Sequence, residues 1–501
     1  MALRVYNTLS HEKELFSPVK PGEVGIYLCG PTVYKESHIG HAVGPVIFDA
    51  IKRYLTYKGY KVRWVVNITD VEDKIIDEAA KQGCGVYELA ERIARSYRDA
   101  LAQLGVRSID DMPKASEHIP EIISMIERLI EKGFAYAVSG DVYFDVSKDD
   151  DYGKLSNRKV DDQAGQREIV SGAKRNPSDF VLWKASKPDE PDDICFASPW
   201  GRGRPGWHIE CSAMSMKYLG ESFDLHGGGM DLIFPHHENE IAQAESYSGK
   251  PFAKYWAHNG LTRLNTKKLS KSDPEMQKIL EKMTLSHLLK HYGGELLRFF
   301  LLSTHYRRPI EFSDEELASK KKGLDTFYRL IDRVERASGR SPYDDLPTLH
   351  KPQLDKYDER YHALVESILA QRTRFLDAMD DDFNTAGAIS VLFQTAGIIN
   401  KFMDQHAVET TMSDELRELA LAATRTLVED GRILGLFEEP PKAAASGGDS
   451  LTGGLLDLFV QLRNDAKNEK NYTLADKIRE QLTDMGVTLE DRPDGTHWRI
   501  G

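Results

Sequence analysis

Short apolar runs alternate with a helical pattern near the start of the chain, and this order predicts an α/β fold. Residues 24–30 and 62–67 are rich in β-branched and aromatic side chains and are bounded by glycine or polar positions, as strands are. Between them, residues 46–57 repeat apolar side chains at helical spacing, and Gly59 follows the last turn. A strand, a helix and a second strand in this order predict a βαβ unit.

The pattern changes twice further along the chain. A helical piece at 119–132 and a polar stretch with few periodic apolar residues predict an insertion at about 110–220, inside a first domain covering 1–311. Beyond it, the stretch that begins at Pro235 again reads as a helix. From 312 to 438 the pattern is helical, and Ser313 with Glu316 forms the capping-box signature of a helix start.

The end of the chain predicts a small separate unit. Residues 439–454 are rich in Pro, Ala, Gly and Ser and read as a linker. A helix is expected over 471–485, within a unit covering 455–501 that ends in a polar tail with Trp498.

Composition restricts the class of protein. The 501 residues contain 41% hydrophobic and 29% charged side chains, an ordinary globular balance that allows about three or four domains. The first residues lack the apolar core of a signal peptide, and no apolar run approaches the roughly 18 residues of a membrane span. A cytoplasmic location with no membrane partner is therefore expected. The formal net charge of −13 disfavours non-specific nucleic-acid binding but leaves room for a local basic patch.

The chain has only four cysteines, Cys29, Cys84, Cys195 and Cys211, too few for a disulfide-rich scaffold. His236 and Glu240 are four residues apart, so on a helix their side chains share one face and form half of a zinc site. Cys29, at the end of a predicted strand, and Cys211 would complete a Cys₂HisGlu set. Equally, both thiols could be buried and the histidine stretch a solvated helix start.

Three further stretches suggest a nucleotide site, although each is weak alone. His38, Gly40 and His41 lie where a strand gives way to a helix, and the N–H groups of a helix start bind anions. Lys268 and Lys271, flanked by hydroxyls, suit a loop that closes over a triphosphate. Three glycines before Asp231 allow close backbone approach to a ligand, with Asp231 accepting from a ribose hydroxyl. The plain alternatives are a helix start and two solvated loops.

These signals occur together and in order, and with them the chain resembles cysteinyl-tRNA synthetases, a family of class I aminoacyl-tRNA synthetases. The matching stretches span nearly the whole chain: CGPTVYKESHIGHA, NITDVEDKII, ASEHI, RPGWHIECSAM, DLHGGGMDLIFPHHENEIAQ, KKLSKS, AMDDDFNT and ADKIREQL with the terminal MGVTLEDRPDGTHW. The resemblance implies a Rossmann-type catalytic domain with an insertion, an α-helical anticodon-binding bundle and a small C-terminal α+β unit for anticodon recognition. It also implies a monomer that joins L-cysteine to tRNA(Cys) with ATP.

The resemblance also implies roles for individual residues. One Zn²⁺ would be held by Cys29, Cys211, His236 and Glu240, and Mg²⁺ would accompany ATP. The histidines of the HIGH motif, His38 and His41, would act on ATP with the lysines of the KMSKS-type loop, Lys268 and Lys271. Substrate and ATP contacts are implied for Gly40, Thr69, Trp207, His226, Gly228, Asp231 and Lys271. Arg492, Trp498 and Arg499 are candidate anticodon contacts, although Trp498 could equally be core.

Two departures from the family pattern and two rival functions remain. Leu269 replaces the usual Met of the lysine loop, and Asp273, Pro274 and Glu275 follow it, which puts acid beside a phosphate-binding lysine. Lys35 stands where the family often has an acidic residue. One rival is a ligase that joins cysteine to an amino-sugar, which would lack the region after Phe312. The other is a non-catalytic tRNA- or protein-binding relative, which would not need the HIGH and loop residues.

Overall fold

The computed structural model describes residues 2–158, 174–188, 190–264, 281–351, 354–411, 413–440, 450–492 and 495–500. The chain forms two compact units. The first contains Met1–Lys321 together with Leu376–Ile389 and Ile433–Gly435, and the second contains Lys322–Phe375, Ser390–Arg432 and Leu436–Gly501. Within the described residues, no helix is both long and apolar enough to cross a membrane.

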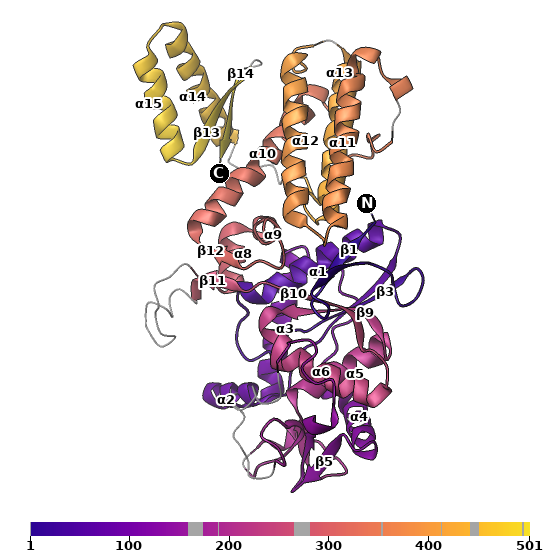
Figure 1. Ribbon diagram of the computed structural model, residues 1–501. Helices are drawn as coiled ribbons and strands as arrows, with labels where there is room; N and C mark the ends of the chain where they lie inside the picture. The colour runs from indigo at the N-terminus through magenta and orange to yellow at the C-terminus, as the bar shows by residue number, and fades with distance from the viewer. Residues whose placement is uncertain are drawn as a thin grey trace. The chain divides into compact units, whose positions relative to one another are not determined.

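The first unit is built on a four-stranded sheet in the order β10-β9-β3-β4, and every pair in it is parallel (Figure 1). Its strands are β3 (Glu23–Leu28), β4 (Lys61–Val66), β9 (Phe223–Gly229) and β10 (Ala253–Asn259). Helix α1 (Ile39–Tyr57) connects β3 to β4, so the βαβ unit expected from the sequence is confirmed. Its start differs from the prediction, because α1 begins seven residues before Val46, in a stretch with two glycines and Pro45 that no apolar pattern marks.

The helices that connect its strands along the chain pack against the sheet. One face is packed by α4 (Ile119–Glu131), α5 (Trp207–Leu219) and α6 (Glu238–Ser248), which share a buried core with Tyr27, Val65 and Trp256 of the sheet. The helical stretches predicted at 119–132 and after Pro235 are thereby confirmed. Among the residues that the structure describes, the other helices of this unit before α10 are α2 (Asp73–Gln82), α3 (Val86–Gln103), α8 (Leu285–Tyr292) and α9 (Gly294–Leu302).

A second, antiparallel sheet interrupts this arrangement between α4 and α5. Its order is β5-β6-β7-β8, with bounds Ala135–Val138, Asp141–Phe144, Phe180–Ala185 and Gly203–Pro205. Helix α5 follows it but belongs to the core of the α/β sheet, although the sequence placed it in the insertion. Because α5 is buried on nearly every side, it has no apolar stripe that would mark it as an amphipathic helix.

Small strands and turns complete the first unit. Strands β1 (Arg4–Asn7) and β2 (Glu12–Leu15) form a hairpin, and β11 (Thr262–Leu264) pairs in parallel with β12 (Ile310–Phe312). Across both units, 3-10 turns lie at Ala115–His118, Val146–Lys148, Asp192–Ile194, Met230–Leu232, Leu354–Lys356 and Glu359–Tyr361, and a π-helical turn lies at Ile233–His237.

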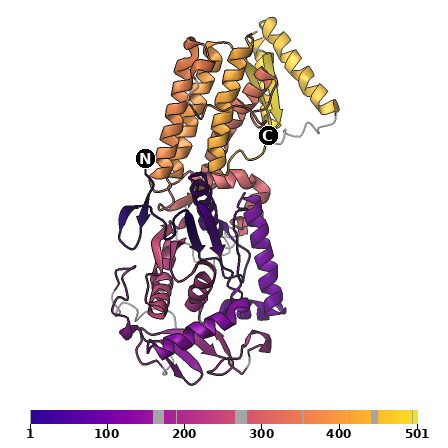
Figure 2. The ribbon, with the colours of Figure 1, turned by 90° about the vertical axis from the view of Figure 1, so that its right-hand side faces the viewer.

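The helices α10 (Asp314–Ser338), α11 (His362–Asp380), α12 (Thr385–Gln405) and α13 (Asp414–Ile433) follow β12. Figure 2 shows α11, α12 and α13 side by side. The predicted helix start is confirmed, because the backbone N–H of Glu316 donates to Oγ of Ser313 at 3.2 Å. One face of α10 is buried, with Leu317, Phe327, Ile331 and Val334 fully inside.

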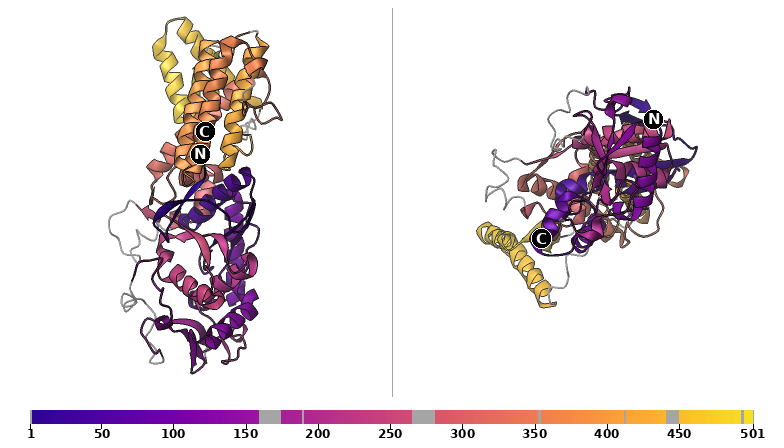
Figure 3. Two further views of the ribbon diagram at one scale, coloured as in Figure 1. Left: turned by 45° about the vertical axis from the view of Figure 1, so that its right-hand side comes forward. Right: turned by 90° about the horizontal axis from the view of Figure 1, so that it is seen from below.

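The C-terminal residues fold around a small core of their own. Helices α14 (Ser450–Asn468) and α15 (Tyr472–Asp484) pack with the hairpin of β13 (Val487–Arg492) and β14 (Gly495–Ile500), seen in yellow in Figure 3. The helix predicted at 471–485 is confirmed. The linker prediction is wrong at its end, because α14 already begins at Ser450 and presents Leu456 and Val460 to this core.

Candidate active site and metal centre

A cavity of about 500 Å³ lies where the parallel strands of the first unit end. Open α/β sheets bind ligands at the carboxyl ends of their strands, and this cavity follows that rule. Cys29 after β3, Gly228 at the end of β9 and Asn259 at the end of β10 all line it. The first turn of α1 and the side chain of Trp207 complete the wall.

The first turn of α1 is built by its two histidines. Nδ1 of His38 accepts the backbone N–H of Gly40 at 3.1 Å, and Nδ1 of His41 accepts the backbone N–H of His38 at 3.3 Å. The two rings stack with their centroids 4.0 Å apart. The turn is therefore a reciprocal capping box in which imidazole replaces the usual hydroxyl and carboxylate.

This capping box determines where the protons of the two rings lie. A neutral imidazole that accepts at Nδ1 carries its proton on Nε2, so each ring can offer one Nε2–H donor. Burial, and then the neighbouring His38, lower the pKa of His41 from 6.5 to about 4. His41 is thus a neutral hydrogen-bond donor at the cavity wall, not a cation, near neutral pH.

Cys29, Cys211, His236 and Glu240 converge next to this cavity. The sulfurs of Cys29 and Cys211 are 3.8 Å apart, Sγ of Cys29 is 3.3 Å from Oε1 of Glu240, and Nε2 of His236 is 3.0 Å from the same oxygen. The potential ligand atoms all lie within 4.8 Å of one another, and all four side chains are buried or half-buried. The set expected from the sequence is therefore brought together, from β3, α5, the turn before α6 and α6 itself.

The spacing of these atoms fits a tetrahedral zinc ion. With Zn–S bonds of about 2.3 Å, a tetrahedron separates two sulfurs by about 3.8 Å, which is the distance observed here and far longer than a disulfide. Thiolate, imidazole and carboxylate are also the donors that zinc prefers. The residues present therefore fit the metal that the resemblance implies.

Neighbouring side chains orient these donors. Nε2 of His226 donates to Oε2 of Glu240 at 2.8 Å, which leaves Oε1 toward Cys29 and His236. With Nε2 of His236 as the ligand atom, its Nδ1–H donates to Nδ1 of His208 at 2.8 Å. Burial opposes the charge of Glu240, but His226 and His236 lower the pKa of its carboxyl to about 2. Glu240 is therefore a carboxylate, as a metal ligand must be.

The thiols of the cluster differ in their protonation. Burial, and then the hydrogen bond and charge of Cys211, raise the pKa of Cys29. Burial opposes ionisation of Cys211 as well, but the hydrogen bond from Cys29 and the neighbouring His236 lower its pKa to about 6. One thiolate and one thiol thus share the site before a metal binds.

The other predicted substrate residues lie at different depths. Gly228 and the exposed Asp231 line the cavity, and Trp207 lines it while its ring stacks on His236 at 4.2 Å. Thr69 is fully buried and donates to Oε2 of Glu210 at 3.0 Å. His226 differs from the expectation of a substrate contact: it is fully buried in β9, behind Glu240, and its ring stacks on Trp256.

The glycine triplet is not the solvated loop of the plain alternative. Gly227, Gly228 and Gly229 end strand β9 and pair with Ala257, His258 and Asn259 of β10. A side chain at Gly227 would collide with the ring of Phe48 from α1, so the glycine lets this helix approach the strand.

Lys268 and Lys271, with Asp273, Pro274 and Glu275, lie outside the described residues. Cys84 and Cys195 are half-buried against a separate apolar cluster, away from the metal donors.

Several neighbours of the site were missed in the sequence. His208 and His237 are both buried beside the metal donors, and Nε2 of His237 lies 3.3 Å from Sγ of Cys29. Cys29, His226, His237 and Glu240 form a second group of potential ligands that overlaps the first. The doubled histidine of PHHENE was the available signal, but only one of the pair stands four residues before Glu240.

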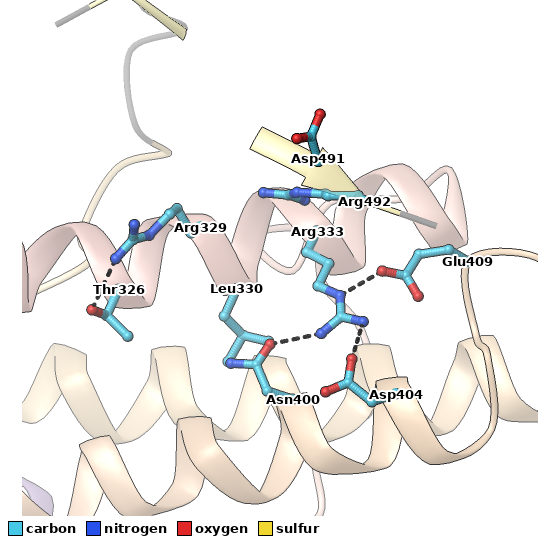
Figure 4. A pocket seen from close by; sticks show the side chains of 9 residues that line it. All are labelled: Thr326, Arg329, Leu330, Arg333, Asn400, Asp404, Glu409, Asp491 and Arg492. Carbon is cyan, nitrogen blue, oxygen red and sulfur yellow. Dashed lines mark hydrogen bonds and ion pairs between the residues drawn. The ribbon is translucent and has the colours of Figure 1, made fainter. Parts of the chain in front are cut away.

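A second cavity, of about 340 Å³, lies within the second unit among α10, α12 and β13 (Figure 4). Arg333 projects into it and donates to Asn400, Asp404 and Glu409 at 3.0, 2.6 and 2.5 Å. This cavity holds no thiol or histidine and carries no part of the chemistry expected at the first.

Comparison with known proteins matches three family models along the chain. Residues 15–322 match the class I (C) tRNA synthetase catalytic domain, 374–438 the DALR domain, and 459–499 the cysteinyl-tRNA ligase anticodon binding domain. Cysteine–tRNA ligases of Heliobacterium modesticaldum and Geobacter sulfurreducens are 46% and 45% identical over 507 and 509 residues, which is 100% of each chain. The chain belongs to the cysteine–tRNA ligase family.

Membership of this family makes the chain an ATP-using aminoacyl-tRNA synthetase with the class I catalytic domain and a helical C-terminal region. Solved structures agree at the level of fold. Methionyl-tRNA synthetase of Mycobacterium tuberculosis, bound by methionyl-adenylate, aligns with a TM-score of 0.59 over 90% of this chain and 96% of that one, at 17% identity.

Proposed function

We propose that this chain activates L-cysteine with ATP, releases pyrophosphate, and transfers the cysteine to tRNA(Cys), with a zinc ion selecting the thiol of the amino acid. The observation that carries the proposal is the place of Cys29. It belongs to the buried Cys₂HisGlu cluster and also lines the cavity that contains the first turn of α1. A thiol-selecting centre and a nucleotide-binding turn therefore share one cavity.

Adenylate formation needs no protein nucleophile. The amino-acid carboxylate attacks the α-phosphate of ATP, so the protein must position the two reactants and stabilise the charge that develops on the phosphates. Nε2–H of His38 and of His41 supply donors at a helix N-terminus, where backbone N–H groups also face an anion. Lys268 and Lys271 would add positive charge, and Mg²⁺ would accompany the phosphates. Gly228 and Asp231, which line the cavity, would contact the ribose.

Selection of cysteine over serine is the difficult part of recognition. An apolar pocket discriminates poorly between two side chains of nearly equal size. Zinc, when bound, favours a soft thiolate over a hydroxyl and lowers the pKa of a thiol that reaches it. Cys29, Cys211, His236 and Glu240 would hold the ion, and His226 and His208 would keep Glu240 and His236 in orientation. Trp207 at the cavity wall and Thr69 behind it would border the substrate.

Recognition of the anticodon is proposed for the C-terminal unit, and the whole chain is proposed to act as a cytoplasmic monomer. The indole N–H of Trp498 donates to Asp457 at 2.7 Å, and its ring packs on the core of this unit. These contacts favour the structural alternative for Trp498 that the sequence left open. Arg492 pairs with Glu490 of its own strand, and both side chains are half-buried, so Arg492 would have to leave this partner to contact a base.

Metal and cysteine can be followed together in one titration. The metal-free protein is loaded with Co²⁺, whose visible absorption reports thiolate ligands, and then titrated with cysteine or serine. The proposal predicts one ion per chain and a further rise in thiolate-to-cobalt absorption with cysteine but not with serine. A spectrum that cysteine leaves unchanged would show that the ion does not meet the substrate.

A further inference from the structure

Helix α1 is fixed behind its catalytic turn by a fully buried ion pair. Nη2 of Arg298, on α9, lies 2.5 Å from Oδ2 of Asp49, and both side chains are at most 1% exposed. Asp49 also accepts from Arg53 at 2.6 Å and from the hydroxyl of Ser108 at 2.5 Å. Burial opposes the charge of Asp49, but Arg298 and Arg53 lower the pKa of its carboxyl below the ordinary value. The pair is therefore charged and fully hydrogen-bonded.

The same arginine joins α1 to the end of the helical region. Nε of Arg298 donates to the carbonyl of Leu434 at 2.7 Å, and Nη1 donates to the carbonyl of Leu104 at 3.3 Å. Gly435 has a φ of +67°, and a Cβ at this position would lie 2.5 Å from the guanidinium carbon. The turn after α13 is thus folded tightly onto Arg298, and its residues belong to the first unit.

A second turn of the helical region holds the last turns of α1. The hydroxyl of Tyr54 donates to Oδ1 of Asp380 at 2.7 Å, and Nζ of Lys58 lies 3.1 Å from the same oxygen. Asp380 ends α11. After Asp381, the next two residues, Asp382 and Phe383, have φ values of +62° and +50°. Two consecutive non-glycine residues in the left-handed region are strained, which requires strong fixation by their surroundings.

Such fixation is present around this turn. Asp382 is fully buried and accepts from the backbone N–H of Tyr6, the hydroxyl of Tyr306 and Nε of Arg307, each at 2.8 Å. The ring of Phe383 meets that of Tyr54 edge-on at 6.4 Å. This turn is the AMDDDFNT stretch of the sequence, and none of the metal or nucleotide contacts proposed above involves it.

We propose that Arg298, Asp49 and Tyr54 are positioning residues for adenylate formation: they hold α1 against the turns at 376–389 and 433–435, and thereby place His38 and His41 on ATP. Pro45 removes one backbone hydrogen bond from α1, but the helix continues through it from Ile39 to Tyr57, so a displacement of its last turns reaches its first. A misplacement of about 1 Å at reacting groups can reduce a rate about 100-fold. The inference rests on the proposed function.

The chemistry of the pair supports a positioning role over a purely stabilising one. A buried ion pair contributes little net stability, and apolar residues of similar size often stabilise a fold as well or better. The guanidinium of Arg298 instead fixes an orientation, because its nitrogens lie in one plane and donate to three separate segments of the chain. An alkyl side chain would fill the same space without fixing the rotation or height of α1.

Two conservative variants test the proposal in the full-length chain. Arg298→Lys keeps the charge, but its single amino group cannot contact all three segments. Tyr54→Phe removes only the hydroxyl group that donates to Asp380. The matched control is Lys13→Met, which removes an exposed ion pair to Asp381 of the same turn. For each protein, the affinity for ATP is measured by calorimetry without cysteine, cysteine-dependent pyrophosphate exchange gives kcat and the KM for cysteine, and Tm and bound zinc are recorded.

The proposal predicts that kcat falls about tenfold or more and that ATP binds several-fold more weakly in both variants, while the KM for cysteine and the zinc content stay within about twofold. Lys13→Met should match the wild type. A lower Tm with unchanged kcat and ATP affinity would overturn the proposal, and so would equal losses of cysteine, zinc and ATP binding. Because ATP affinity is read without cysteine, the result stands even if the wild type activates another amino acid.

Discussion

Nδ1 of His41 accepts the backbone N–H of His38 at 3.3 Å while the two imidazole rings stack 4.0 Å apart. The pair is thus orientated by the protein itself before any nucleotide arrives. Gly40 lies between them and donates to Nδ1 of His38, so three residues of one turn determine one another's positions. Catalysis by positioned donors depends on such preorganisation.

Gly40→Ala is expected to disturb this turn directly. A Cβ at Gly40 would lie 2.8 Å from Cε1 of His38, so the ring must leave its capping position. We expect cysteine-dependent pyrophosphate exchange to fall by roughly 10- to 100-fold, the range that misplaced catalytic groups produce. Gly397→Ala, within α12 and free of close neighbours, serves as the control for a glycine replaced in a helix. Equal activity of the two variants would refute the capping argument.

The charge state of His41 can be measured separately. Its pKa of about 4 predicts a neutral ring at pH 5.5, where an ordinary histidine with a pKa of 6.5 would be mostly charged. NMR with ¹³C-labelled histidine, assigned by the loss of one signal in His41→Gln, should give a midpoint near 4. A midpoint near 6.5 would show that burial does not control this ring.

The same shift affects folding stability, with a definite sign. Because the pKa of His41 is lower in the folded chain than in the unfolded one, the unfolded chain binds the proton at higher pH. The stabilisation is present above pH 6.5 and is lost as the pH falls from 6.5 toward about 4. His41→Gln should therefore lose less stability than the wild type over this range in chemical denaturation, and a steeper loss would contradict the assignment.

Cys211→Ser should separate amino-acid binding from nucleotide binding. The substitution removes one soft donor from the metal cluster but leaves the first turn of α1 in place. We expect the KM for cysteine to rise at least tenfold and the KM for ATP to change less than about threefold. Cys84→Ser, a half-buried thiol in a separate cluster, is the control. Equal losses for cysteine and ATP would indicate a purely structural metal.

Removal of residues 450–501 should affect tRNA and not adenylate formation. This segment folds around its own core, and every residue assigned to adenylate formation lies before Lys321. We expect pyrophosphate exchange within about twofold of wild type and a KM for tRNA at least tenfold higher, because anticodon contacts would be lost. Trp498→Phe should lower the stability of the C-terminal unit instead, since its indole N–H donates to Asp457. A base-specific effect of Trp498→Phe on charging would show that this side chain contacts tRNA.

Sequence patterns were sufficient where one side of an element is apolar and the other polar. This holds for α4, α10 and α15, and the i,i+4 spacing of His236 and Glu240 predicted that they would share a helix face. Strands β3 and β4 were recognised instead as short β-branched and aromatic runs bounded by glycine or polar residues. Patterns failed where burial surrounds an element. Helix α5 and the first turns of α1 have no polar side, so their small and polar residues look irregular in one dimension.

Long-range contacts explain the remaining differences. His226 reads as a ligand contact because it begins a glycine-rich stretch, but the strand pairing that buries it behind Glu240 is not visible along the chain. Arg298 bonds to Asp49 and Leu104, which lie 249 and 194 positions before it in the chain, and to Leu434, which lies 136 positions after it. No local periodicity predicts such a junction, whereas the family resemblance does predict the metal donors.

We expect the Cys₂HisGlu cluster and the first turn of α1 together to charge tRNA with cysteine and to reject serine. Its most direct test is ATP-dependent attachment of radiolabelled cysteine to tRNA by the purified zinc-loaded protein, with labelled serine in a parallel reaction. We expect stable cysteinyl-tRNA and no serine product. Pyrophosphate release with cysteine but uncharged tRNA would contradict it and point to another acceptor, and seryl-tRNA would contradict selection by the metal.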